Sequence, residues 1–170
     1  LMRSKGALRA QEILIKQYKE EFKGADPLVV ACEIGNLKDV KTFVNAGMKV
    51  NQVGKTSEGY GWTPLIAAAY YEHFQIVQYL IKKRADPNIA LDSNGWNALH
   101  YAASWNKKDT KVIELLLSNM TLDINKKDSY RRTPLDCAYK YNRSLLYLGI
   151  IDLMRSKGAL RAQEILIKQY

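Results

Sequence analysis

Residues 63–88, TPLIAAAYYEHFQIVQYLIKKRADPN, contain the signals for two short helices and the turn that closes them. Thr63 can cap the free amides at the start of a helix, and Pro64 follows at the first helical position, where the missing N–H of proline costs nothing. After a run of small residues, the apolar residues within 76–81 recur at the three- and four-residue steps of one helix face. The stretch therefore predicts a helical hairpin that ends in a turn at residues 84–88.

The same pattern occurs four times along the chain. Each unit opens with a helix start, continues with small residues that allow close helix packing, and then carries a second apolar run. Asn51, Asn88 and Asn125 follow the closing turns at equivalent places. The four helix starts are Asp26-Pro27-Leu28, Thr63-Pro64-Leu65, Asn97-Ala98-Leu99 and Thr133-Pro134-Leu135. We expect four units, at about residues 25–57, 58–91, 92–127 and 128–159.

The pattern T-P-L-H-x-A-A, followed by V-V-x-x-L-L and G-A-D-x-N at a period of about 33 residues, resembles the ankyrin repeat. The resemblance covers residues 25–159 and implies an all-α solenoid of stacked helix-turn-helix units with helical caps. Only the third unit keeps the histidine of the motif, as His100, and the resemblance implies that this side chain braces neighbouring loops with hydrogen bonds. Val29, Ile66 and Asp136 stand at the same position in the other units.

The first 18 residues, LMRSKGALRAQEILIKQY, are repeated letter for letter as residues 153–170. We expect the first copy to form a capping helix within residues 1–24, because a solenoid exposes an apolar face at each end unless a helix covers it. The second copy would complete the fourth unit and begin another capping helix at residues 160–170. The apolar positions through which the copies could associate are Leu8, Ile15, Tyr18, Leu160, Ile167 and Tyr170.

Three origins of this duplication stay open from the sequence. The chain could be cut or permuted from a tandem array with a period of 152 residues, from Leu1 to Leu153. It could instead be engineered so that identical segments compete for one docking site, or the second copy could be an accident of how the ends were chosen. Exchange within a chain would act as a conformational switch. Exchange between chains would be head-to-tail domain swapping, which gives a homo-oligomeric ring or an open filament.

The net charge of +9 does not indicate a nucleic-acid-binding protein. Each terminal copy carries four basic residues and one Glu, so the two copies supply +6, and the middle 134 residues supply only +3. Nucleic-acid binding needs a concentrated basic face with groups that read or stack on bases. No apolar segment approaches the roughly 20 residues that span a bilayer, and no signal-peptide core is present. We therefore expect an intracellular, cytoplasmic protein with neither a nucleic-acid nor a membrane partner.

The sequence lacks the phosphate-loop, nucleophile-elbow and zinc-protease motifs of common catalytic sites. The segment Gly54-Lys55-Thr56 only echoes the end of a phosphate loop and reads as a turn. Cys32 and Cys137 occupy small-residue positions of distant units, which predicts buried thiols without a disulfide. Neither His73 nor His100 has cysteines or carboxylates at metal-ligand spacing. We expect a non-enzyme with no cofactor and no metal.

The resemblance to ankyrin repeats also implies a concave groove that binds a partner protein. The loops, and the two positions after each small-residue pair, would line it. Tyr, Trp and Arg are frequent at these places, and the same residue types are enriched at interface hot spots. The candidate partner-binding residues are Tyr60, Trp62, Tyr70, Tyr71, Trp96, Trp105, Tyr130, Arg132 and Tyr141. The sequence thus favours a non-catalytic protein–protein interaction scaffold.

Trp62, Trp96 and Arg132 occupy the same position in successive units. This spacing predicts a ladder along the loops in which the Arg132 guanidinium lies against the Trp96 ring. Such a ladder could knit neighbouring loops together, or it could contact a partner. The sequence leaves both interpretations open.

Overall fold

The computed structural model describes residues 2–91, 93–105, 109–142 and 147–168. The helices are α1 Met2–Glu21, α2 Pro27–Glu33, α3 Leu37–Asn45, α4 Pro64–Tyr70, α5 Phe74–Lys82, α6 Ala98–Trp105, α7 Lys111–Leu117, α8 Pro134–Tyr141, α9 Tyr147–Ser156 and α10 Ala162–Ile167. The strands β1 Gly54–Lys55 and β2 Gly61–Trp62 pair antiparallel as a small hairpin. Among the described helices, none is long and apolar enough to cross a bilayer.

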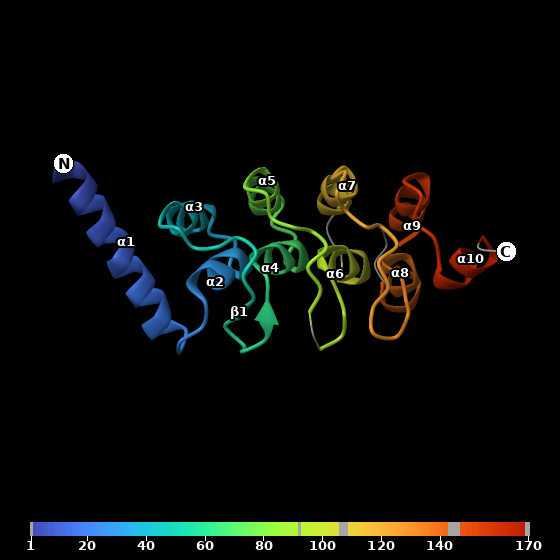
Figure 1. Ribbon diagram of the computed structural model, residues 1–170, viewed down its shortest axis with the longest axis horizontal. Helices are drawn as coiled ribbons and strands as arrows, with labels where there is room; N and C mark the ends of the chain where they lie inside the picture. The colour runs from blue at the N-terminus through green and yellow to red at the C-terminus, as the bar shows by residue number, and fades with distance from the viewer. Residues whose placement is uncertain (1, 92, 106–108, 143–146, 169–170) are drawn as a thin grey trace.

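The short helices lie in two rows, which is the arrangement of a solenoid (Figure 1). Helices α2, α4, α6 and α8 form one row, in which each helix contacts the next. Helices α3, α5, α7 and α9 form the second row, and each packs on the preceding helix of its own unit. Helix α1 lies at one end of the stack and α10 at the other. The predicted all-α repeat solenoid is therefore confirmed.

Polar side chains start the helices of the first row as the sequence predicts. Asp26 Oδ1 accepts hydrogen bonds from two amides of α2, both at 3.0 Å. Thr63 Oγ1 accepts from the Ile66 amide at 3.1 Å. Thr133 and Asp136 form a reciprocal capping box at the start of α8. Because the first amides of a helix have no partner within the helix, each of these caps stabilises its helix by about 1 kcal/mol.

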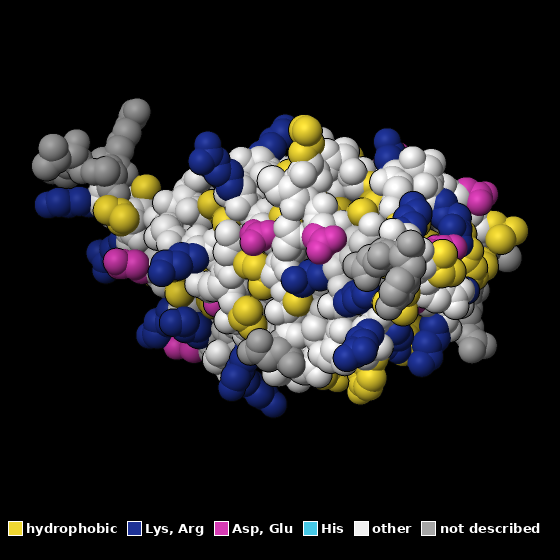
Figure 2. All heavy atoms as spheres, turned by 45° about the vertical axis from the view of Figure 1, so that its right-hand side comes forward, with side chains coloured by type: hydrophobic (Ala, Val, Ile, Leu, Met, Phe, Trp, Pro, Cys, Tyr) yellow, Lys and Arg dark blue, Asp and Glu magenta, His cyan; other side chains and the backbone are white. Residues whose placement is uncertain are grey.

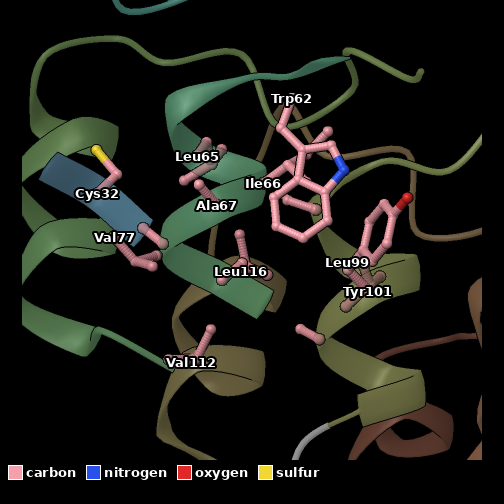
Figure 3. Close-up of a cluster of buried hydrophobic side chains, with 14 of the residues drawn as sticks. Cys32, Trp62, Leu65, Ile66, Ala67, Val77, Leu99, Tyr101, Val112 and Leu116 are labelled. Carbon is pink, nitrogen blue, oxygen red and sulfur yellow. The ribbon is translucent and has the colours of Figure 1, made fainter. Parts of the chain in front are cut away.

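The core lies between the rows and is continuous along the stack. The side chains of Ala67 and Ala68 are fully buried, and their small size lets α4 lie close to its neighbours in the row. Val77 of the second unit belongs to the same buried cluster as Leu99 and Leu116 of the third (Figure 3). Each unit therefore buries its apolar surface against the next unit as well as within itself.

Two smaller expectations have different outcomes. Cys32 and Cys137 are buried and form no disulfide, which confirms the prediction of free core thiols.

The prediction of a turn at Gly54-Lys55-Thr56 is wrong, because Gly54 and Lys55 form strand β1. A Cβ atom at Gly54 would collide with the Asp26 side chain, so glycine lets the hairpin lie against the start of α2. This approach joins two residues that lie far apart in the sequence of unit one, and it leaves no local sequence signal.

Asparagine side chains join each closing turn to the next. Asn88 Oδ1 accepts a hydrogen bond from the Asp123 amide at 2.7 Å, and Asn88 Nδ2 donates to the Thr121 carbonyl at 2.6 Å. Asn51 makes the equivalent bonds toward unit two, and Asn125 makes them toward the end of unit four. The three equivalent positions in the sequence therefore form one ladder along the edge of the stack.

His100 braces two neighbouring loops, which confirms the role that the resemblance implies. Its Nδ1 lies 2.7 Å from Asn97 Oδ1, and its Nε2 lies 3.4 Å from the carbonyl oxygen of Arg132 in the next unit. The side chain is fully buried, and this burial lowers the pKa of His100 to about 4. The imidazole is therefore neutral in the folded chain at neutral pH.

The first copy of the duplicated segment is part of one long helix, α1. Its second half packs on unit one: Tyr18 is buried, and its hydroxyl donates to Asp39 Oδ2 at 2.7 Å. Ile15 is partly buried against the same core. Residues 5–10, in the first half, are all exposed, and the apolar side chains of Leu8 and Ile13 are 56% and 51% exposed. It projects beyond the body of the molecule (Figure 2).

The second copy of the segment is not one helix. Helix α9 ends at Ser156, a turn follows, and α10 begins at Ala162. Leu160 is partly buried, whereas Ile167 is 75% exposed. Tyr170 lies outside the described residues. The described residues of the two copies thus take different conformations at the two ends of the stack.

Replacing Asn88 by Ala should lower the free energy of unfolding by about 1–2 kcal/mol, because the change removes two hydrogen bonds between neighbouring turns. Urea denaturation followed by circular dichroism measures the change. Asn45→Ala is the matched control, since Asn45 is exposed at the end of α3. The control should shift the unfolding free energy by less than about 0.5 kcal/mol. Equal losses in the two variants would contradict a stabilising ladder.

Acidification should destabilise the chain through His100. The folded-state pKa of about 4 lies below the ordinary value of 6.5, so the unfolded chain takes up the proton first. The free energy of unfolding should therefore fall as the pH drops from 6.5 toward 4, by at most about 1.4 kcal/mol per pH unit.

Urea midpoints measured at several values of pH between about 7 and 5 test this dependence. His100→Gln should flatten it, whereas the control His73→Gln should leave it in place. A pH dependence that is the same in His100→Gln and in the unsubstituted chain would show that another group causes it.

Candidate partner-binding surface

A hollow with a volume of about 730 Å³ lies where the loops and first-row helices of units two and three meet. Its lining comes from the β1–β2 hairpin, the end of α4, the loop that precedes α6, and α6 itself. Glu58 is the charged side chain among the described lining residues. Six aromatic side chains line it: Tyr60, Trp62, Tyr70, Tyr71, Tyr101 and Trp105. The site is thus an aromatic surface with an acidic group at one side.

The hairpin holds two of these rings in place. Thr56 pairs with Tyr60 across it, since the Thr56 amide donates to the Tyr60 carbonyl at 2.8 Å and the Tyr60 amide donates to Thr56 Oγ1 at 3.0 Å. The Tyr60 ring stacks on Trp62 with 6.1 Å between centroids. Trp62 also contacts Tyr70 at 5.0 Å and Tyr101 at 5.4 Å, and Tyr101 belongs to the next unit (Figure 3). Trp62 therefore joins the hairpin of unit two to helix α6 of unit three.

Tyr70 and Tyr71 come from the end of α4, where the chain leaves the helix. Their rings meet edge to face at 4.9 Å. The Tyr71 hydroxyl lies 3.5 Å from Glu33 Oε1. Burial, followed by the charges of Glu33 and Glu58, raises the pKa of Tyr71 to about 12. These carboxylates give this side of the hollow a negative potential.

A second cluster lies on the loop of unit four. Arg132 Nη2 forms an ion pair with Asp128 Oδ2 at 2.7 Å, and the Trp96 indole donates to the same oxygen at 3.0 Å. The Arg132 guanidinium lies over the rings of Tyr130 and Tyr141, at 4.7 and 5.4 Å from their centroids. The contact predicted between Arg132 and the Trp96 ring is therefore replaced by a carboxylate that both side chains share.

Asp128 holds this second cluster together. Burial disfavours its charged form, but hydrogen bonds from Arg132, the Trp96 indole and the Tyr130 amide outweigh burial and lower the pKa of Asp128. The carboxylate is therefore charged at neutral pH, and it orients Arg132 toward the two tyrosines. The sequence analysis missed Asp128, because an acidic residue in a loop carries no sign of the partners it will have in the fold.

The nine candidate residues differ in exposure. Trp62 and Trp96 are 8% and 6% exposed, and their ring contacts with the next unit fit the interpretation that they knit neighbouring loops. Tyr60, Trp105 and Tyr130 are 58%, 41% and 72% exposed. The remaining four candidates, Tyr70, Tyr71, Arg132 and Tyr141, are partly buried. Contact with a partner stays a prediction for all nine.

Tyr101 lines the hollow, and the sequence analysis missed it. It stands just before the small-residue pair of α6, at the position that Ala67 occupies in α4. Ala67 and Cys137 stand at this position in units two and four, so the large side chain of Tyr101 was a usable sequence signal for the site.

The basic side chains form no comparable site on the face that Figure 2 presents, because Lys and Arg are spread over α1 and the body of the stack there.

Comparison with known families agrees with the fold. A family model for ankyrin repeats in three copies matches residues 3–90, and another for ankyrin repeats in many copies matches residues 67–117. The first match covers more than half of the chain.

Several known proteins are similar to the chain. It is 33% identical over 103 residues to ankyrin repeat and SAM domain-containing protein 6 of Rattus norvegicus, which covers 61% of the chain and 11% of that protein. It is 32% identical over 125 residues to Rabankyrin-5 of Mus musculus, which covers 69% of the chain and 10% of that protein. It is 29% identical over 168 residues to "Probable 26S proteasome regulatory subunit p28" of Saccharomyces cerevisiae, which covers 95% of the chain and 71% of that protein.

The chain therefore spans only about a tenth of the first two of these relatives, 11% and 10% of their lengths. The match to the family models and the two rows of stacked helices lead to the same conclusion. The chain belongs to the ankyrin-repeat family.

Proposed function

We propose that the chain is a non-catalytic scaffold that binds a partner protein through the hollow between units two and three. Ankyrin repeats generally mediate protein–protein interactions, and the yeast relative is named as a regulatory subunit of a larger assembly. The observation that carries the proposal is the lining of six aromatic side chains around a cavity of about 730 Å³. Such rings bury a large area while losing little rotamer freedom, which suits them to an interface.

The chemistry of the lining restricts the kind of partner segment. Trp62 is buried, so it supports the exposed Tyr60 ring directly instead of being available itself. The exposed Trp105 ring contacts Tyr70, which in turn contacts Trp62. Glu58, with Glu33 behind Tyr71, favours a positively charged group at this side. The proposed partner segment therefore combines apolar or aromatic side chains with a basic one.

Peptides selected on the immobilised chain from a displayed random library provide a probe for this site. Trp105→Ala or Tyr71→Ala should weaken the binding of a selected peptide at least about tenfold, since truncating a hot-spot aromatic costs about 2 kcal/mol or more and a tenfold change in affinity is about 1.4 kcal/mol. Fluorescence anisotropy with a labelled peptide gives the affinities, and circular dichroism confirms that each variant keeps its helices. Met120→Ala is the matched control, because Met120 is fully exposed and lies outside the hollow.

If the selected peptides bind both aromatic variants as they bind the unsubstituted chain, the hollow is not the binding site. Glu58→Gln should weaken peptides that carry Lys or Arg and leave neutral peptides unchanged. Equal effects of Glu58→Gln on basic and neutral peptides would show that the charge of the lining plays no part in recognition.

We infer a second candidate function, self-association through the duplicated ends. The observation that favours it is the uncovered apolar surface at both ends of the stack. Leu8 and Ile13 are exposed on α1, and Leu166 and Ile167 are 54% and 75% exposed on α10. Such surfaces on a solenoid are usually covered.

Light scattering after size exclusion tests self-association over a wide range of concentrations. The full chain should stay monomeric at micromolar concentration and grow in mass as its concentration approaches the millimolar range, and a chain lacking residues 1–13 should stay at the monomer mass throughout. This deletion keeps Ile15 and Tyr18, whose contacts with unit one are part of the fold. If both chains remain monomeric, the ends do not associate.

A further inference from the structure

The two copies of the duplicated segment have the same backbone conformation in one part and different conformations in another. Residues 10–15 are helical in α1, and their equivalents 162–167 form α10. Residues 5–9 are also helical in α1, whereas the equivalent residues 157–161 form a turn in which Gly158 has φ +88°. Gly6, the counterpart of Gly158, sits inside a helix, where glycine is less stable than alanine by about 1 kcal/mol. Because the letters are identical, only the surroundings account for the difference.

The turn of the second copy is held by unit four and by Asn125 at the end of unit three. Ala159 is 1% exposed. The Leu160 amide donates to Asn125 Oδ1 at 2.7 Å, and the Leu160 carbonyl accepts from Thr133 Oγ1 at 2.7 Å. Arg161 Nε lies 3.0 Å from an oxygen of Asp136. Unit four, together with Asn125 of unit three, therefore presents a built receptor for this stretch of sequence.

The corresponding residues of the first copy have no such contacts within their own molecule. Ala7, Leu8 and Arg9 match Ala159, Leu160 and Arg161 letter for letter, and all three are exposed on α1. They belong to the half of α1 that projects from the stack (Figures 1 and 2). Each molecule thus displays a free copy of a segment that its own unit four holds in a second copy.

We propose that residues 5–13 of one molecule can take the place of residues 157–165 on unit four of another, with Gly6 as the hinge. The proposal rests on the second candidate function above and assigns its site. The incoming residues 5–9 would change from helix to turn, while residues 10–21 stay helical, because that part of the two copies already agrees. Unit four of one chain would then be followed directly by unit one of the next, a heterologous contact that closes as a ring or continues as a filament.

The resident copy protects against this exchange. The resident residues 157–165 make the same contacts that residues 5–13 of another molecule would make. Because the resident residues are tethered next to the site, their effective concentration there is on the order of millimolar. The intact chain should therefore keep its own copy in place at micromolar concentration. Exchange should begin when the resident copy is weakened and the free copy is left intact.

The duplication offers matched variants of the full-length chain. Ala159→Asp with Arg161→Glu places a charge at a buried methyl and a carboxylate beside Asp136, so the resident copy should leave unit four. This variant should show a mass that rises with concentration in light scattering. The same changes in the free copy, Ala7→Asp with Arg9→Glu, fall on exposed positions and should leave a monomer. The chain with all four changes should also be monomeric, because neither copy can then dock.

A labelled peptide with the sequence of residues 1–18 gives a second readout. It should bind the Ala159→Asp/Arg161→Glu chain at least about tenfold more tightly than the unsubstituted chain, whose site is occupied. The same peptide with Asp and Glu at its positions 7 and 9 should bind neither chain. If circular dichroism shows that the double substitution unfolds the chain, the milder Arg161→Glu variant carries the same comparison, with Arg9→Glu as its control.

The outcomes separate this proposal from self-association in general. The mass of the Ala159→Asp/Arg161→Glu chain and that of the chain with all four changes could rise equally with concentration. In that case the molecules associate through another surface. That result would overturn the exchange of the duplicated segments but would leave self-association as a function. Peptide binding that is equal for the substituted and unsubstituted chains, or absent from both, overturns the exchange site itself.

Discussion

The burial of each unit against its neighbour is the interaction on which the rest of this structure depends. A pair of short helices cannot cover its own apolar surface, and the core runs without interruption from Tyr18 on α1 to Ala159 after α9. The small residues of the first row allow the close approach, and the asparagine ladder joins the turns along the edge. Most stabilising contacts therefore connect units that are adjacent in the sequence, and the two ends are the places where this burial is incomplete.

The same constraint explains how the proposed binding surface is organised. The rings of Trp62 and Trp96 each contact a tyrosine on the first-row helix of the next unit. These contacts hold the loops that carry the two tryptophans in a fixed position. Exposed rings such as Tyr60 and Trp105 then stand on a preorganised base. Preorganisation lowers the entropy lost on binding, which favours this surface as a site for a partner.

Local signals in the sequence predicted most of the fold. The helix starts at Asp26, Thr63 and Thr133 follow from capping chemistry that acts within four residues, and the structure has them where the sequence places them. The β1–β2 hairpin was not predicted, because the approach of Gly54 to Asp26 involves residues far apart in the chain. The partners of Arg132 were missed for the same reason. Pairing between polar side chains depends on the fold and not on local pattern.

The duplicated segment is the clearest case of what a sequence cannot specify alone. The two copies carry the same residues and therefore the same local sequence signals for helix formation. Gly6 nevertheless lies within a helix, whereas Gly158 lies in a left-handed turn. The difference follows from the burial of Ala159 and from the hydrogen bonds of Leu160 to Asn125 and Thr133, which the exposed residues Ala7 and Leu8 do not have on α1. Neighbouring units therefore choose between two conformations of one sequence.

The chemical shifts of the Gly6 and Gly158 Cα carbons, measured by nuclear magnetic resonance on chain labelled at glycine, test this central claim most directly. The account predicts a helical shift for Gly6 and a left-handed turn shift for Gly158 in the same monomeric sample. Equal shifts for the two glycines would mean that the sequence, and not the neighbouring unit, determines the conformation of the segment, which would contradict the account.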